Sequence, residues 1–322
     1  MNLKNSFFNV IKNPKTGLGF IVSFLAIWWV FQDLNFSKLK SILQNINIYF
    51  LALASILLWA CNWFRGLRWS YLFKTEDSIS IASLYRAELI GYFGNNILPL
   101  RLGEVLRSHI ISQQYSLSTS YVFGTVVLER LIDTLTLGFF ACVLLFIYPL
   151  NETMKSYVLW GIIISFLTVF TFFCLLRIFP SFQSNGNKIV EIFLNILSGL
   201  KSIRTEKIIY IFISSFLIWL IYLVDIYFIQ KAFGFDLTGP QILTILVISS
   251  LALAIPSAPG MIGTFHAAIK YIMVDMFYFT ADEGNAFAIL IHGYGYILLT
   301  ILGAYYFFRY QIKNTKIKDI EI

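Results

Sequence analysis

Long apolar runs separated by short polar segments dominate the hydrophobic pattern of this 322-residue chain. Runs such as 208–230 and 286–308 supply the roughly 20 residues that a helix needs to cross a membrane. The runs are continuous and lack the alternation of a membrane β-barrel, so helices must satisfy the backbone. We therefore predict an all-α, polytopic membrane protein with about eight transmembrane helices, forming a single integral membrane domain over residues 1–322. The predicted spans lie at about 18–31, 48–64, 118–148, 157–179, 208–230, 241–255, 264–279 and 285–308.

Two segments interrupt this pattern with glycine, asparagine and proline. The first is GYFGNNILPLRLGE at 91–104, and the second is PSAPGMIGTFHAA at 256–268. Such residues interrupt helical hydrogen bonding and leave backbone groups that need protein or water as partners. These segments therefore cannot face lipid. We predict that residues 84–112 form a re-entrant helical hairpin that enters and leaves the membrane on the cytoplasmic side. One broken element in each half is typical of repeat-built transporters, so the chain has possible pseudo-repeat halves at about 15–180 and 205–310.

The distribution of charged residues predicts how the protein is oriented in the membrane. The chain is 58% hydrophobic and 13% charged, and its net charge of +7 comes mainly from basic residues between the apolar runs. That placement is typical of cytoplasmic loops and of contact with anionic lipid headgroups, and it argues against a nucleic-acid partner. Arg65, Arg68 and Lys74 follow the run at 48–64, with Trp63 and Trp69 as predicted interfacial anchors. We expect a bacterial cytoplasmic (inner) membrane protein with both termini in the cytoplasm.

Residues 187–204 show a different pattern, because apolar residues recur there at helical spacing among lysines and arginines. This arrangement predicts an amphipathic helix on the cytoplasmic membrane surface.

The candidate chemistry is concentrated at 86–133, where ionisable side chains interrupt otherwise membrane-like sequence. A charged group at membrane depth costs roughly 2.5 to 3.5 kcal/mol on insertion scales, so such a concentration predicts a protein-lined functional cavity. The ionisable side chains of this stretch are Arg86, Glu88, Arg101, Glu104, Arg107, His109, Glu129, Arg130 and Asp133.

Two short motifs carry most of these charges. In LRLGEVLRSHI, a helix beginning near residue 102 places Glu104 and Arg107 on one face with Arg101 at its amino-terminal edge, which suits a phosphate headgroup. In VLERLID, carboxylates and a guanidinium share adjoining faces, and we expect Arg107 or Arg130 to pair with the carboxylates. The alternative for both motifs is a set of internal structural ion pairs.

Other intramembrane polar residues leave both functional and structural interpretations open. His266 and Lys270 follow the second break, and His266 is either a proton-linked switch or a satisfied core histidine. Asp225 and His292 are isolated within apolar runs. No nucleotide loop, zinc-spaced cluster or nucleophile motif occurs in the sequence, so we predict no catalytic residue, cofactor or metal site.

The ordered motifs GYFGNNILPLRLGEVLR, VLERLID and IPSAPGMIGTFHAA resemble those of the flippase-like integral membrane family, which includes the transmembrane region of lysylphosphatidylglycerol synthases. The resemblance covers roughly residues 15 to 310. It implies a helical fold with re-entrant elements that moves lipids such as aminoacylated phosphatidylglycerol or lipid-linked sugars between leaflets. Matched by position, it implies roles for Asn95, Pro99, Arg101, Gly103, Glu104, Arg107, Glu129, Arg130, Asp133, Pro256, Pro259, Gly260 and Gly263.

The sequence departs from the family pattern in two places. Where the third motif commonly continues to an acidic residue, this chain has His266, which argues against an acidic role there. The chain also ends shortly after the last predicted span, so we expect no aminoacyl-transfer domain and no synthesis of lysyl lipid.

We therefore predict a lipid flippase that moves a phospholipid, an aminoacyl-phospholipid or a lipid-linked sugar. The alternatives are an intramembrane enzyme acting on a lipid phosphate and a non-catalytic membrane partner of a lipid-modifying enzyme or glycosyltransferase. The predicted substrate-binding residues are Asn95, Arg101, Glu104, Arg107, Glu129, Arg130 and Asp133. The predicted gating and cavity residues are Gly94, Pro99, Gly103, Pro256, Pro259, Gly260, Gly263 and His266.

Overall fold

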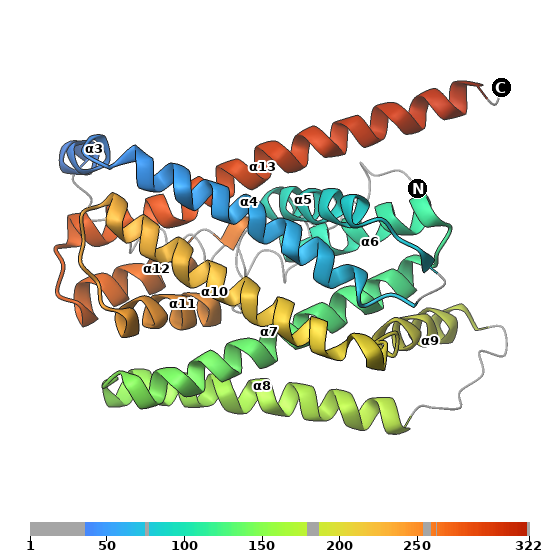
Figure 1. Cartoon of the computed structure of the whole chain (residues 1–322), viewed down its shortest axis with the longest axis horizontal. Coiled ribbons are helices and arrows are strands. Elements are labelled where there is room, and N and C mark those ends of the chain that lie inside the picture. Colours follow the sequence, from blue (N-terminus) through green and yellow to red (C-terminus); the bar gives the residue numbers. More distant parts are fainter. Residues whose placement is uncertain (1–35, 75–76, 179–186, 254–258, 262, 321–322) are drawn as a thin grey trace.

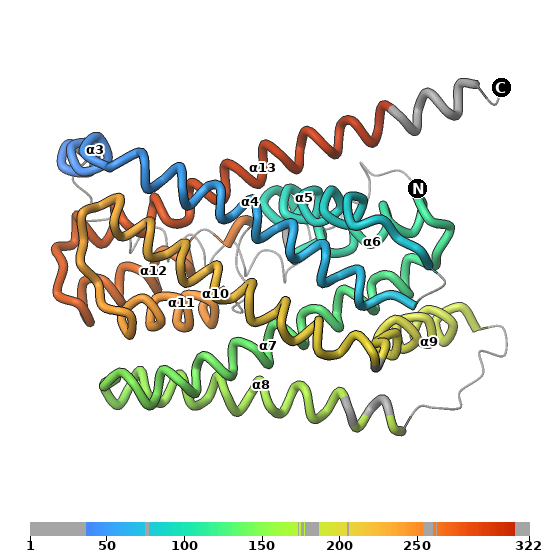
Figure 2. Tube along the Cα trace, viewed as in Figure 1, coloured from blue at the N-terminus to red at the C-terminus, as the bar shows by residue number. Residues whose placement is uncertain are grey.

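The computed structural model describes residues 36–74, 77–178, 187–253, 259–261 and 263–320, and within these ranges the chain is helical without any strand (Figure 1). Most long helices run along the long axis of the molecule, whereas α3 is seen nearly end-on in the same view (Figure 2). The all-α prediction is therefore confirmed. The α-helices are α3 (Phe36–Gln44), α4 (Ile48–Ser70), α5 (Ile81–Ile97), α6 (Leu102–Tyr115), α7 (Thr119–Ile147), α8 (Glu152–Ile178), α9 (Lys188–Leu200), α10 (Ile208–Ala232), α11 (Gly239–Leu253), α12 (Thr264–Lys270) and α13 (Ala281–Ile320).

In the described part of the chain, five helices are long and apolar enough to cross a membrane, namely α4, α7, α8, α10 and α13. The predicted first span at 18–31 lies outside the described residues. The segments 241–255 and 264–279 were predicted as two further spans around a broken element, and the described helices there, α11 and α12, are shorter than a span. Helix α11 has only 15 residues, and α12 has seven before it continues into the short π-helix η5 (Tyr271–Met276). Over their described residues both are shorter than the roughly 20 residues of a span, and the proline and glycine break lies between them.

These short helices form two hairpins that point toward each other. The first hairpin is α5 and α6 joined by the 3₁₀ turn η2 (Pro99–Arg101), as the sequence predicted. The second is α11 and α12, with the turn η4 (Pro259–Met261) between them. They occupy opposite halves of the molecule along its long axis, and their tips, η2 and η4, are in contact (Figure 1). The chain thus brings irregular backbone from two distant segments to one level near its centre.

The two tips have the same local design. Each turn begins with proline and continues with two residues of positive φ: Leu100 (56°) and Arg101 (54°) in the first tip, Gly260 (70°) and Met261 (56°) in the second. Left-handed backbone is costly for a residue with a side chain, and only Gly260 among these four avoids that cost. Three non-glycine residues held this way indicate that contacts around the tips compensate for the strain.

Close packing of glycine backbones holds the arms of the first hairpin together. A Cβ atom added to Gly94 would lie 2.7 Å from the Cα of Gly103, closer than real Cβ contacts allow. The arms can therefore approach only because both positions lack side chains. This backbone contact lies one turn from the tip and fixes how α6 faces α5.

Helix α9 lies within the segment predicted as an amphipathic surface helix, and its apolar stripe has two different environments. The carboxyl-terminal part, including Leu197 and Leu200, is buried, and Gly199 packs against the backbone of α7 near Gly124. Near the amino terminus, Ile189 is 78% exposed. Membrane-surface contact by this exposed part stays a prediction.

Candidate functional site

A buried ionic cluster joins the first hairpin to α4 and α7. It contains four arginines and four carboxylates, which form a continuous set of ion pairs. The predicted pairing of the two sequence motifs is confirmed, because Arg107 Nη1 lies 3.1 Å from Glu129 Oε2 and Arg130 Nη2 lies 2.9 Å from Glu104 Oε1. The members of the ionic cluster are Arg65, Arg68, Glu88, Glu104, Arg107, Glu129, Arg130 and Asp133.

Arg65 and Arg68 of α4 belong to the sealed interior of this cluster, although the sequence had placed them at the cytoplasmic interface. Arg65 is 3% exposed and pairs with Glu129, and Arg68 is fully buried with its Nη1 2.6 Å from Asp133 Oδ1. The correction has a physical reason: an arginine near a helix end can enter the protein when carboxylates from neighbouring helices replace water. The missed signal was spacing, since these arginines continue the buried stripe of Ala54, Leu58 and Cys61 on α4.

Trp69 is also a core residue and not an interfacial anchor. Its side chain is fully buried, and its Nε1 donates to Thr125 Oγ1 at 2.9 Å. The guanidinium carbon of Arg107 lies 4.7 Å from the centroid of the Trp69 ring, so the indole covers one face of the cluster. Trp63, by contrast, is 42% exposed and remains compatible with an interfacial position.

The cluster has an interior and an accessible edge. Glu88, Arg107 and Glu129 are at most 2% exposed, and Arg107 contacts both Glu88 and Glu129. Along the edge, Glu104 is 13% exposed, and Arg130 reaches 37%. Asp133 also belongs to the edge at 14%. A ligand that approaches from solvent or lipid therefore meets Arg130 and the two edge carboxylates, whereas the interior groups are already paired with one another.

Arg101 lies at the tip of the first hairpin and is exposed. Its Nη2 donates to the carbonyl oxygen of Leu253 in the second hairpin, and this nitrogen is 3.8 Å from Met261 Sδ. Among the described residues, its Nε and Nη1 have no protein partner, and Arg101 forms no ion pair with a carboxylate. The contact between the tips holds the guanidinium through Nη2 alone, as far as the described residues show.

The charge balance distinguishes Arg101 from the other arginines. Four guanidinium groups against four carboxylates make the ionic cluster neutral, since +4 and −4 sum to zero. Arg101 brings the total beside the tips to +1. This excess positive charge favours an anion at the accessible edge.

The remaining predicted residues lie around the two tips. Gly94 and Gly103 form the close contact of the first hairpin, and Asn95 beside them has a buried Oδ1 without a hydrogen-bond partner among the described residues. His266 is buried in the second hairpin, with its ring centroid 4.9 Å from that of His292. Pro256 lies outside the described residues. The predicted residues that form the second tip are Pro259 and Gly260 in η4 and Gly263 at the amino-terminal cap of α12.

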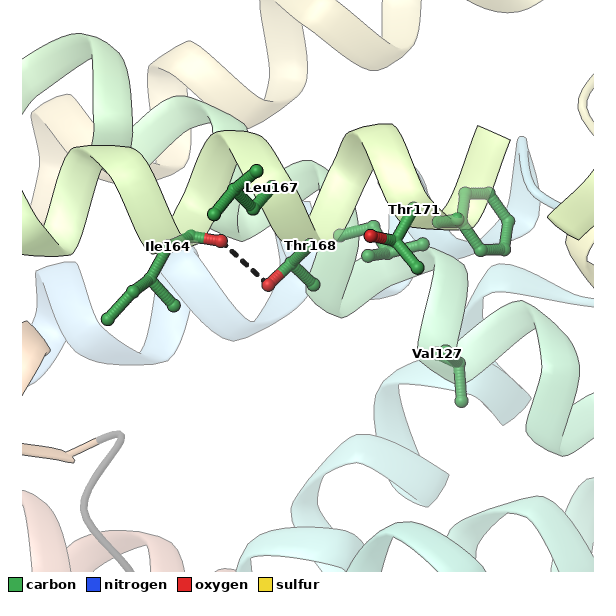
Figure 3. Close-up of a pocket in the computed structure, with 7 residues that line it drawn as sticks. Val127, Ile164, Leu167, Thr168 and Thr171 are labelled. Carbon is green, nitrogen blue, oxygen red and sulfur yellow. Dashed lines mark hydrogen bonds between the residues drawn. The ribbon is translucent and has the colours of Figure 1, made fainter. Parts of the chain in front are cut away.

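An apolar groove of about 510 Å³ runs between α7 and α8. In Figure 3, Val127 lies on the α7 side, and the α8 side carries Ile164, Leu167, Thr168 and Thr171. Thr168 does not present a free hydroxyl donor to the groove, because its Oγ1 donates to the Ile164 carbonyl at 2.8 Å. The groove therefore offers apolar surface beside the stretch of α7 that carries Arg130. Its lining residues are Val127, Leu131, Ile164, Leu167, Thr168, Thr171 and Phe172.

Comparisons with known proteins give a consistent family. Residues 17–303 match the family model described as the lysylphosphatidylglycerol synthase TM region. A UPF0104 membrane protein of Methanocaldococcus jannaschii, MJ1078, is 27% identical over 67% of this chain and 93% of its own length. A second from that organism, MJ1595, is 31% identical over 40% of each chain, and one from Methanothermobacter thermautotrophicus is 25% identical over 65% of this chain and 69% of its own. No solved structure matches the chain.

Proposed function

Since the chain belongs to the lysylphosphatidylglycerol synthase TM region family, we propose that this integral membrane protein moves a lipid with an anionic headgroup between the two leaflets. The observation that carries the proposal is Arg101, the arginine in excess over the carboxylates at the meeting point of the tips. A guanidinium whose Nε and Nη1 have no partner among the described residues is suited to two hydrogen bonds with phosphate oxygens. The anion would bind between Arg101 and the edge of the ionic cluster at Arg130.

The two hairpins provide the means of alternating access. They extend from opposite ends of the bundle and meet near its centre, as interrupted helices do at the substrate sites of repeat-built transporters (Figure 1). A bound headgroup at the tips would then be reached from one side or the other, depending on which hairpin moves. The ionic cluster behind the first hairpin supplies a rigid support, because its interior charges satisfy one another.

The apolar groove between α7 and α8 suits an acyl chain of the same lipid. Leu131 of the groove is adjacent in sequence to Arg130, so a headgroup at the cluster edge leaves its chain beside apolar surface. An acyl chain that stays in contact with apolar side chains avoids transfer through a polar interior. In this proposal only the headgroup crosses the centre of the protein.

Leaflet exchange of fluorescent phosphatidylglycerol in proteoliposomes, followed by dithionite quenching, tests the function. We expect wild-type protein to accelerate exchange and Arg101→Ala to lower the rate by about tenfold to a hundredfold, because a charge-assisted hydrogen bond contributes roughly 1.5 to 3 kcal/mol. Arg101→Lys should retain part of the rate. The matched control is Arg86→Ala, which removes an exposed arginine of the same hairpin whose hydrogen bonds within the described chain are local, to Ala82 and Ser83. Equal rates in Arg101→Ala and wild type would refute the assignment of the headgroup site.

The groove makes a separate prediction. Thr168→Trp should fill it and slow lipid exchange severalfold, while short-chain lipids should be slowed less than long-chain ones. Ile163→Trp, an exposed position on α8 outside the groove, should leave the rate unchanged. If both tryptophan variants exchange long-chain lipid at the wild-type rate, the acyl chain of the lipid does not occupy this groove during transport.

A further inference from the structure

Asp225 of α10 is a buried carboxylate outside the ionic cluster. Its residue is 6% exposed, and Tyr294 of α13 donates its hydroxyl hydrogen to Oδ2. The other oxygen, Oδ1, is buried without a hydrogen-bond partner, and no lysine, arginine or histidine of the described residues forms an ion pair with Asp225. Burial of a carboxylate without a cation carries a large desolvation cost, which favours the neutral acid.

The helices around Asp225 provide little to balance a negative charge. Helix α4 presents Cys61, an uncharged thiol that lies near Asp225 and near Arg65 of the ionic cluster. On α10 itself, Tyr222 interacts with Cys61. On α7, the charge of Asp133 is paired with arginines of the ionic cluster, and α11 carries no titratable side chain between Gly239 and Leu253. The group that directly contacts Asp225 is the Tyr294 hydroxyl.

Tyr294 lies on α13, which also contacts both hairpins close to their tips. Two residues further along α13, the Tyr296 hydroxyl donates to the Asn96 carbonyl at 3.1 Å, and Asn96 Nδ2 donates to Thr300 Oγ1 at 2.7 Å. The Tyr296 ring also abuts Gly260 of the second tip, where an added Cβ would lie 2.5 Å from Tyr296 Cε2. A change in the charge of Asp225 that shifts α13 would therefore also shift the hairpin tips at the proposed headgroup site.

We propose that Asp225 and Tyr294 form a proton-binding site that couples lipid movement to a proton gradient. The proton joins Oδ1 of the ionised carboxylate to give the neutral acid, while Tyr294 continues to donate to Oδ2. Loss of that proton places an uncompensated charge between α10 and α13, which favours a different arrangement of α13 and of the hairpin tips. The coupling rests on the proposed lipid transport, whereas proton binding by Asp225 does not depend on it.

Two measurements separate these claims. Infrared difference spectra of the protein in liposomes, recorded between alkaline and acidic pH, should contain the C=O band of a protonated buried carboxyl group that is missing in Asp225→Asn. The control is Asp236→Asn, which changes an exposed aspartate paired with Lys231 at 2.7 Å and should keep the band. In the exchange assay, an imposed gradient should accelerate wild-type lipid exchange by up to about tenfold for each pH unit, and Asp225→Asn should exchange at one rate with or without the gradient.

The outcomes are distinguishable. A band that persists unchanged in Asp225→Asn would overturn the proton site whatever the transport result. A wild-type exchange rate that is the same with and without the gradient would overturn the coupling and leave the proposed lipid transport in place. No exchange by wild-type protein would overturn both the proposed transport and its coupling, while the infrared band would still decide whether Asp225 binds the proton.

Discussion

Replacing Arg107 with methionine is expected to destabilise the protein by about 3 to 5 kcal/mol, the cost of removing one partner from a buried ion pair. Arg107 is 1% exposed and lies between Glu88 and Glu129. Glu129 would still contact Arg65 and Arg68, but the nearest remaining guanidinium nitrogen to Glu88 would be Arg65 Nε at 3.7 Å. The substitution therefore leaves Glu88 buried with a weakened partner. The free energy of unfolding can be measured by denaturing the protein with SDS in mixed micelles.

The matched control is Arg86→Met, which removes an exposed arginine from the same helix as Glu88 and should change the free energy of unfolding by no more than about 0.5 kcal/mol. Adding Glu88→Gln to Arg107→Met should recover part of the lost stability, because the orphaned charge is removed with it. Equal stability of Arg107→Met and Arg86→Met would mean that the interior of the cluster contributes nothing to folding.

The sequence predicted the first hairpin and the pairing of its charges with α7 because both depend on local chemistry. Gly94, Pro99 and Gly103 break an apolar run where a continuous helix would otherwise form, and freed backbone groups cannot face lipid. The charges of Glu104 and Glu129 required partners for the same reason, and the nearest candidates in the sequence were arginines. These inferences needed no knowledge of the tertiary arrangement.

The part played by α4 could not be predicted in this way. An arginine followed by a polar loop has two low-cost environments, the membrane interface and a buried carboxylate, and the local sequence around Arg65 and Arg68 suits both. Only the packing of α4 beside α7 distinguishes them, because it brings Glu129 and Asp133 within reach. The arginines at the carboxyl-terminal end of α4 were therefore assigned to the cytoplasmic interface, although they belong to the buried ionic cluster.

The lengths of the arms of the second hairpin could not be predicted for a related reason. Apolar sequence on both sides of a proline and glycine break fits two spans joined by a loop as well as two half-length arms. Length decides between them, and α11, at 15 residues, falls short of a span. The contact of Arg101 with Leu253 then explains why the two tips meet, since a guanidinium is a favourable partner for carbonyl groups at the carboxyl-terminal end of α11.

Gly103→Ala is expected to force the arms of the first hairpin apart and to cost about 1 to 3 kcal/mol, the usual penalty for overpacking. An added Cβ would lie 2.5 Å from Asn95 N and 2.6 Å from Asn95 Oδ1, and it would also meet the carbonyl oxygen of Gly91. Two of these atoms belong to the α5 backbone and cannot rotate away. Because Arg107 lies four residues further along α6, separation of the arms also withdraws its guanidinium from Glu88.

Gly138→Ala on α7 is the control for this substitution, because its added Cβ meets nothing within 4 Å. Both substitutions replace glycine with alanine in a helix, so both gain the same helix propensity, up to about 1 kcal/mol. The free energies of unfolding of the two variants, measured by SDS titration, should therefore change in opposite directions. Lipid exchange should fall in Gly103→Ala and stay at the wild-type rate in Gly138→Ala, because Arg101 precedes α6 and moves with it. Stabilisation of both variants to the same extent would show that the arms are not in backbone contact, and the position assigned to Arg101 at the tip would lose its support.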